Sequence, residues 1–130
     1  MNKFSRQSQD ALLTCDHDLQ EVFNHVLQIH DCTILEGFRG QEKQDEYYRT
    51  GKSKVKYPDS KHNQKPSEAV DAGPYPIDWN DTKRFYYFAG IVKGVAASLG
   101  IEVRWGGDWD SDNDLNDQTF MDLVHFELVK

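Results

Sequence analysis

Two histidines and one aspartate of this chain have the types that a catalytic zinc site uses. His62 stands in a long polar stretch, Asp71 follows nine positions later, and His125 lies near the end of the chain. Two neutral imidazoles and one carboxylate hold Zn²⁺ with one position left open for water. Zinc so held lowers the pKa of that water toward about 7 and polarises a substrate carbonyl. Any acidic domain offers such triples, so spacing alone leaves an ordinary polar surface as the alternative.

Two carboxylates near His125 are candidates for the proton transfers of a hydrolase. Asp122 stands three residues before His125, where a tight turn entering a strand would bring its carboxylate beside the activated water. A carboxylate there can take the proton of the water and pass it to the leaving amine. A solvated aspartate in a turn is the alternative. Glu127 shares a strand face with His125 by alternation and is the rival base, or else a supporting or surface residue.

The segments around these residues predict an α+β domain. Apolar spacing or helix-forming composition predicts helices, and short β-branched or alternating segments predict strands. The expected helices cover 16–29, 41–49 and 81–100, and the expected strands cover 32–36, 69–73, 101–105 and 124–129. Asp81 is the expected N-cap of the last helix, and Gly100 is expected just past its end. Long loops are expected over 51–68 and 106–118. This order favours an antiparallel or mixed sheet packed with helices.

Composition excludes several classes of protein. The 130 residues carry 15 Lys and Arg against 22 Asp and Glu, a net charge of −7, which opposes nucleic acid as a partner. No stretch is apolar enough for membrane insertion, and the first residues lack the apolar segment of a signal peptide. We therefore expect one domain over 1–130, made in a cytosol. Cys15 and Cys32 have no CxxC spacing and are expected as small buried thiols.

Segments from four parts of the chain are together more specific than any one alone. They read EGFRGQEKQ (36–44), SKHNQKPSEAVD (60–71), WGGDW (105–109) and DLVHFEL (122–128). In this order they resemble the phage endolysin branch of the D-Ala-D-Ala carboxypeptidase-like (LAS-type) zinc peptidases, whose relatives include L-alanyl-D-glutamate endopeptidases. The resemblance implies the α+β fold of LAS and hedgehog-like zinc peptidases. It leaves an N-terminal helical region of about 1–31 outside the motifs and implies a catalytic core over about 32–130.

The resemblance implies roles for the residues that match the motifs of the family. It implies one Zn²⁺ held by His62, Asp71 and His125, with Asp122 as the catalytic acid and base. Arg39, in an E-G-x-R context, is implied to stabilise the oxyanion or to hold a substrate carbonyl or carboxylate. Eight residues separate His62 from Asp71, a longer spacing than in many members. If the extra residues do not bulge outward, Asp71 is the ligand that would be misplaced.

Other polar and aromatic residues near the motifs have two interpretations each. Ser60 either orients substrate or caps its loop. Trp105 and Trp109 either line a peptide groove or form a buried aromatic wedge.

Three aspartates in the acidic run 108–117 have the spacing of a calcium loop. Asp110, Asp112 and Asp114 stand at alternate positions, but the glutamate that an EF-hand needs at its twelfth position is replaced by Met121. A solvated acidic loop is the expectation, and a Ca²⁺ site is the alternative.

Together these features predict a zinc-dependent peptidase that cuts the peptidoglycan stem peptide between L-Ala and D-Glu. We expect a monomeric phage endolysin that reaches the cell wall after holin-mediated release and serves host lysis. A D-Ala-D-Ala carboxypeptidase is the alternative within this class. A non-catalytic, zinc-stabilised module that binds cell-wall peptide is the alternative from another class, and the presence of Asp122 and Arg39 speaks against it. A metal-free acidic interaction protein is the third alternative.

Overall fold

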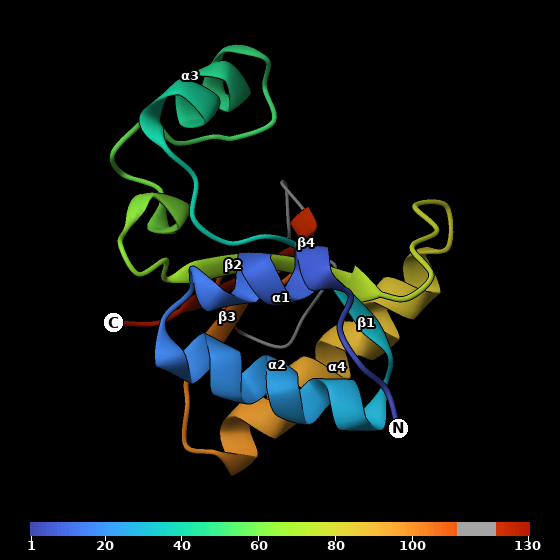
Figure 1. Ribbon diagram of the computed structural model, residues 1–130. Helices are drawn as coiled ribbons and strands as arrows, with labels where there is room; N and C mark the ends of the chain where they lie inside the picture. The colour runs from blue at the N-terminus through green and yellow to red at the C-terminus, as the bar shows by residue number, and fades with distance from the viewer. Residues whose placement is uncertain (112–121) are drawn as a thin grey trace.

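The computed structural model describes residues 1–111 and 122–130 (Figure 1). In these residues helices and strands combine into the expected α+β fold. The helices are α1 (Arg6–Leu13), α2 (His17–Ile29), α3 (Gln41–Arg49) and α4 (Thr82–Ser98), with a short 3-10 helix η1 (Lys61–Asn63). The strands are β1 (Cys32–Glu36), β2 (Ala69–Pro74), β3 (Val103–Gly106) and β4 (Asp122–Leu128).

The strands form an antiparallel sheet in the order β1-β2-β4-β3. Of the two expected sheet types, antiparallel and mixed, the described strands form the first. The register sets Asp71 of β2 opposite His125 of β4, and Arg104 of β3 opposite Glu127 of β4. Since side chains of a strand alternate between faces, these four polar residues share the face opposite to that of Val70 and Phe126.

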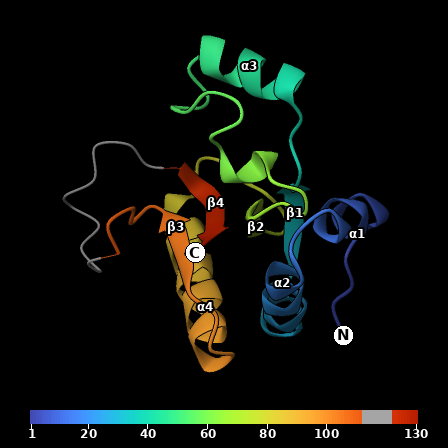
Figure 2. The ribbon, with the colours of Figure 1, turned by 90° about the vertical axis from the view of Figure 1, so that its left-hand side faces the viewer.

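The other face of the sheet packs on α2 and α4 and forms the core. Phe126 of β4 meets Phe23 of α2 and Phe88 of α4 edge to face, with ring centroids 5.6 and 6.2 Å apart. All three rings are fully buried. Figures 1 and 2 show α2 and α4 together on this side, while α3 and η1 lie on the opposite side of the sheet. The face of the sheet that carries Asp71 and His125 is therefore the one that lies toward α3 and η1.

Helix ends follow the expected signals in part. Asp16 is the N-cap of α2, and its side chain accepts a hydrogen bond from the backbone N–H of Asp18. Gly100 follows α4 with φ +73°, a conformation that favours glycine. Asp81 holds the N-cap position of α4, but its side chain makes no capping hydrogen bond to a described residue. The α3 bounds match the expected 41–49.

Several boundaries differ from the sequence expectation. Asp122 is the first residue of β4 and pairs with Gly106, so it is part of the strand rather than of a tight turn. The third strand covers 103–106 instead of 101–105. The helix α1 was not predicted as a separate element, because Ser8 and Leu12 are the residues it buries and they form no apolar stripe.

Cys15 and Cys32 are free and buried, as expected. Burial raises the pKa of each thiol to about 12, so both remain protonated at neutral pH. In the part of the chain that the structure describes, no helix has the length and apolar character needed to span a membrane.

Candidate metal and catalytic centre

The three predicted metal ligands converge on one point. His62 Nε2 lies 3.1 Å from Asp71 Oδ1, and His125 Nδ1 lies 3.4 Å from the same oxygen. Each of the three residues offers a ligand atom within 4.8 Å of the others. The β2–β4 register explains why Asp71 and His125 meet, and η1 carries His62 over them. The long spacing between His62 and Asp71 therefore does not displace Asp71.

The outer nitrogens of both histidine rings face hydrogen-bond acceptors. His62 Nδ1 lies 2.7 Å from the Gly37 carbonyl oxygen, and His125 Nε2 lies 2.7 Å from Glu127 Oε1. Since each acceptor requires a proton on the nitrogen that it faces, a neutral ring turns its lone pair inward. Two such lone pairs and the Asp71 carboxylate then point at one another, which is unfavourable unless a cation lies between them. This donor set fits a Zn²⁺ ion.

Glycine at position 37 is needed for close packing beside the site. A Cβ atom there would collide with the Ala11 carbonyl oxygen and the Thr14 hydroxyl at the end of α1. The same residue supplies the carbonyl oxygen that orients His62. The N-terminal helix is thereby packed against the segment that carries this acceptor.

Without a metal ion, the cluster favours the protonated form of His125. Burial would raise the pKa of Asp71, but the hydrogen bonds from His125 and His62 outweigh it and hold that pKa well below its usual range. Burial would lower the pKa of His125, but hydrogen bonds to Asp71 and Glu127 raise it to about 9. A dication bound among these residues would displace the extra proton of His125.

Asp122 lies near this cluster and has the electrostatics of a base. Burial raises the pKa of its carboxyl group, and the negative charge of Asp71 raises it further. The positive charges of His125 and His62 act in the opposite direction. A carboxylate with a raised pKa accepts a proton more readily than an exposed one, which suits the role predicted for it.

Arg39 is buried beside the ligands in a fixed orientation. Its Nε and Nη2 atoms donate to Glu36 Oε1 at 3.0 and 2.7 Å, and its Nη1 donates to Gln44 Oε1 at 2.8 Å. Nη2 lies 3.8 Å from Asp71 Oδ2. The guanidinium group also lies over the Tyr47 ring, 4.5 Å from its centroid. These contacts place a permanent positive charge at the edge of the candidate centre.

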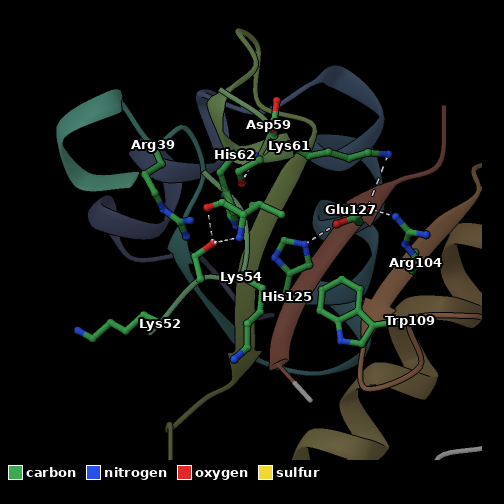
Figure 3. Close-up of a pocket in the computed structure, with 13 residues that line it drawn as sticks. Arg39, Lys52, Lys54, Asp59, Lys61, His62, Arg104, Trp109, His125 and Glu127 are labelled. Carbon is green, nitrogen blue, oxygen red and sulfur yellow. Dashed lines mark hydrogen bonds and ion pairs between the residues drawn. The ribbon is translucent and has the colours of Figure 1, made fainter. Parts of the chain in front are cut away.

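A pocket of about 400 Å³ opens over the centre (Figure 3). Arg39, His62 and His125 line it, and Trp109 forms part of its wall with its ring 5.2 Å from the His125 ring. Ser60 also lines the pocket. These geometric features are those of a buried metal centre at the floor of a substrate-sized cavity.

The comparisons with known proteins identify the family. A family model described as phage L-alanyl-D-glutamate peptidase matches residues 1–129. The chain belongs to this family. It is 33% identical over 135 residues to an L-alanyl-D-glutamate peptidase of Escherichia phage T5, and the match covers 98% of each chain. The crystal structure of the Serratia marcescens L-Ala D-Glu endopeptidase ChiX is similar with a TM-score of 0.76 and 26% identity, over 98% of this chain and 91% of that one.

Within this phage peptidase fold, the two tryptophans that were candidates for a peptide groove have different positions. Trp109 lines the pocket, in keeping with a groove residue. Trp105 is buried in the core, with its indole N–H donating to the Leu123 carbonyl oxygen at 2.9 Å, so the groove interpretation is wrong for this residue. Strand alternation is the reason, because it turns Trp105 toward the helices and Arg104 toward the pocket.

Ser60 caps η1, as one of its two interpretations predicted. Its hydroxyl accepts a hydrogen bond from the His62 backbone N–H at 3.2 Å, and the Asn63 side chain accepts one from the Ser60 backbone N–H at 3.1 Å. This reciprocal capping fixes the short helix that carries His62. Since Ser60 also lines the pocket, its cap and a contact with substrate are compatible.

The acidic calcium-loop candidates lie mostly outside the described residues. Asp110 is exposed, whereas Asp112 and Asp114 belong to the undescribed segment. The calcium alternative therefore stays a prediction.

Sequence reasoning also missed several residues that support the site. Gln44, Glu36 and Gly37 carry no signal of their own, although all three lie in the segment that resembles the family.

Proposed function

We propose that this chain is a zinc-dependent endopeptidase that hydrolyses the bond between L-Ala and D-Glu in the stem peptide of bacterial peptidoglycan. Membership of the phage L-alanyl-D-glutamate peptidase family supports this substrate. The observation that carries the proposal is the convergence of His62, Asp71 and His125 under a pocket that Arg39 also lines. The role that follows is that of a phage endolysin in host lysis.

His62, Asp71 and His125 would hold one Zn²⁺ through His62 Nε2, an Asp71 carboxylate oxygen and His125 Nδ1. Bound zinc supplies such a reaction with acidified water and with a polarised scissile carbonyl. Asp122 takes the proton as the water oxygen adds to the carbonyl carbon of L-Ala. When the C–N bond breaks, Asp122 returns this proton to the departing nitrogen of D-Glu.

Arg39 has the geometry to stabilise negative charge during this reaction. Its guanidinium group is held by Glu36 and Gln44 before substrate arrives, so little side-chain entropy is lost when an anion binds. An oxygen that becomes negative in the transition state gains more from such a fixed charge than the neutral carbonyl does. Arg39 would therefore stabilise the oxyanion or hold a carboxylate of the substrate.

The charge of the pocket suits an acidic substrate. Five cationic side chains line it together with the carboxylates of Asp59 and Glu127, although the whole chain has a net charge of −7. The cations are those of Arg39, Lys52, Lys54, Lys61 and Arg104. A D-Glu residue has two carboxyl groups, of which at most one continues the peptide. The local excess of positive charge would attract the other.

The remaining features of the proposal follow from the same resemblance. The enzyme would act as a monomer with one zinc ion and would be made in the host cytoplasm. It would reach the cell wall after a holin opens the inner membrane. Dependence on Ca²⁺ is the alternative that the Asp110, Asp112 and Asp114 spacing leaves open.

Synthetic peptides test the scissile bond. Zinc-loaded protein is incubated with a stem peptide that contains L-Ala–D-Glu and with a peptide that ends in D-Ala-D-Ala, and the products are identified by mass spectrometry. We expect cleavage before D-Glu, loss of cleavage with a chelator, and recovery with zinc. Release of D-Ala alone would instead establish the carboxypeptidase. Binding of either peptide without cleavage would establish the non-catalytic module.

A further inference from the structure

Charged side chains gather around the buried carboxylate of Glu127, behind His125. Glu127 Oε1 contacts His125 Nε2 at 2.7 Å, while Glu127 Oε2 accepts a hydrogen bond from Arg104 Nη2 at 2.6 Å. The Lys61 ammonium lies 3.7 Å from the same Oε2. Figure 3 shows Lys61 and Arg104 directed toward Glu127, with the His125 ring on its other side. Each oxygen of this carboxylate therefore has its own partners.

The strand pattern explains why Glu127 and His125 meet. The two residues are two positions apart in β4, so they share a face. The β3–β4 register then brings Arg104 opposite Glu127. Lys61 immediately precedes the ligand His62 in η1, and its ammonium also donates to the Leu128 carbonyl oxygen. Three elements around the metal centre thus meet at one carboxylate.

The contact between Glu127 and His125 determines which ring nitrogen carries the proton when the ring is neutral. A carboxylate accepts a hydrogen bond only from a protonated nitrogen, so Glu127 keeps the proton of the neutral ring on Nε2. His125 Nδ1, 3.4 Å from Asp71 Oδ1, then presents its lone pair to the metal centre. Arg104 and Lys61 compensate the buried negative charge that this arrangement needs.

The same contacts argue against Glu127 as the base of the reaction. Its Oε1 is engaged by His125 Nε2, the ring nitrogen that does not face Asp71, and its Oε2 is engaged by Arg104. Asp122 has no such pair of partners among the contacts described for it, and the charge of Asp71 acts on it directly. Asp122 is therefore the better candidate for the base that accepts the proton of water.

We propose that Glu127 is a positioning residue that fixes the tautomer and orientation of His125 for zinc, and that Arg104 and Lys61 hold Glu127 in place. This inference rests on the proposed zinc site. It predicts that loss of Glu127 acts first on metal affinity and on the coordination geometry, and only through them on turnover. Carboxylates that support histidine ligands in this way change metal affinity by about 10–100-fold.

The test compares Glu127→Leu, Glu127→Gln and the wild-type protein for zinc affinity, measured by competition with a chromophoric chelator. We expect Glu127→Leu to bind zinc about 10–100-fold more weakly. Glu127→Gln keeps an oxygen that can accept the Nε2 proton, so it should retain most of the affinity. The exposed Glu102 offers a matched control, and Glu102→Leu should bind zinc like the wild type.

The visible absorption of cobalt bound in place of zinc gives a second measurement, which would not change if Glu127 only stabilised the fold. The visible absorption of Co²⁺ bound at this site should change in Glu127→Leu and stay close to wild type in Glu127→Gln.

Should Glu127→Leu fold poorly, Arg104→Gln offers a milder variant, because the Arg104 side chain is 39% exposed. Arg104→Gln should weaken zinc binding less than Glu127→Leu does, and its effect should shrink when Glu127 is already replaced by Gln.

Wild-type zinc affinity in Glu127→Leu would overturn the inference. If turnover in both Glu127 variants were then also reduced by more than about 10²-fold, Glu127 would be the base. Failure of the wild-type protein itself to bind zinc would contradict the proposed function instead, so the two failures are distinguishable.

Discussion

At the residue scale, His62 and His125 are constrained from both sides of each ring. An acceptor holds the outer nitrogen, and Asp71 faces the inner one. The residue types and spacing of these three candidate ligands were visible in the sequence. The acceptors were not predicted as such, because a backbone carbonyl at Gly37 carries no sequence signal and Glu127 was an open choice between base and supporting residue.

Replacing His125 by alanine should remove both metal and activity. His125→Ala leaves His62 and Asp71 as the remaining protein ligands, too few to hold a catalytic zinc ion tightly. We expect zinc content, measured by elemental analysis after dialysis, to fall from one per chain to near zero, with loss of peptide cleavage. His25→Ala is the control, since this exposed histidine lies on α2 away from the site. Full zinc content in His125→Ala would exclude it as a ligand.

Replacing Asp122 by asparagine should separate catalysis from metal binding. Asp122→Asn cannot accept the proton of water but keeps the size of the side chain. We therefore expect wild-type zinc content and a kcat lower by about 10²-fold or more, measured with the L-Ala–D-Glu peptide. Full activity would remove Asp122 as the base, and loss of zinc would make it a ligand.

At the element scale, α3 is attached to the body of the molecule by a polar residue. Gln44 is fully buried, although α3 is otherwise polar and mostly exposed. Its side-chain oxygen accepts from Arg39 at 2.8 Å, and its nitrogen donates to Ser53 Oγ at 2.9 Å and to the Val55 carbonyl oxygen at 2.8 Å. One amide thus joins α3, the pocket wall at 53–55 and the guanidinium group of Arg39.

Replacing Gln44 by leucine should weaken substrate binding without touching the metal. Gln44→Leu leaves the buried Arg39 Nη1 without this acceptor, at a cost of about 1–3 kcal/mol, and removes one of the two side-chain donors to the Val55 carbonyl oxygen. We expect a lower Tm, a KM several-fold higher and unchanged zinc affinity. Gln41→Leu, at an exposed position of the same helix, is the control. A wild-type KM in folded Gln44→Leu would show that the hydrogen bonds of Gln44 do not shape the pocket.

Elements with a strong local signal were predictable from the sequence, and their arrangement was not. The apolar period of 16–29 and the glycine after the last helix fixed α2 and α4 closely, and α3 matched its expected bounds. The order β1-β2-β4-β3 depends on contacts between distant segments that no local pattern encodes. The groove position considered for Trp105 was wrong for this reason. The sequence predicted a strand at this residue, but which face of the sheet its side chain lies on depends on the β3–β4 register.

At the scale of the whole molecule, the candidate metal centre couples stability to pH. The pKa of His125 rises from about 6.5 to about 9 on folding without metal. Its contribution to stability is therefore complete below pH 6.5 and is lost as the pH rises through 9. Zinc binds the neutral rings, so its stabilising effect grows over the same interval.

Thermal unfolding at a series of pH values measures this coupling. The Tm of the metal-free protein should fall between pH 6.5 and 9, and the difference in Tm between zinc-loaded and metal-free protein should widen. In metal-free His125→Ala the fall should be much smaller. A metal-free Tm that stays constant or rises over this interval in the wild type would contradict the coupling.

The proposed zinc centre of this member of the phage peptidase family is expected to cut peptidoglycan before D-Glu. The most direct measurement is the identification by mass spectrometry of new amino termini in purified peptidoglycan treated with metal-free and with zinc-loaded protein. We predict new D-Glu amino termini with the zinc-loaded protein, nearly none with the metal-free protein, and recovery when zinc is added back. Absence of D-Glu termini with zinc-loaded wild-type protein, or an equal yield without metal, would contradict the account.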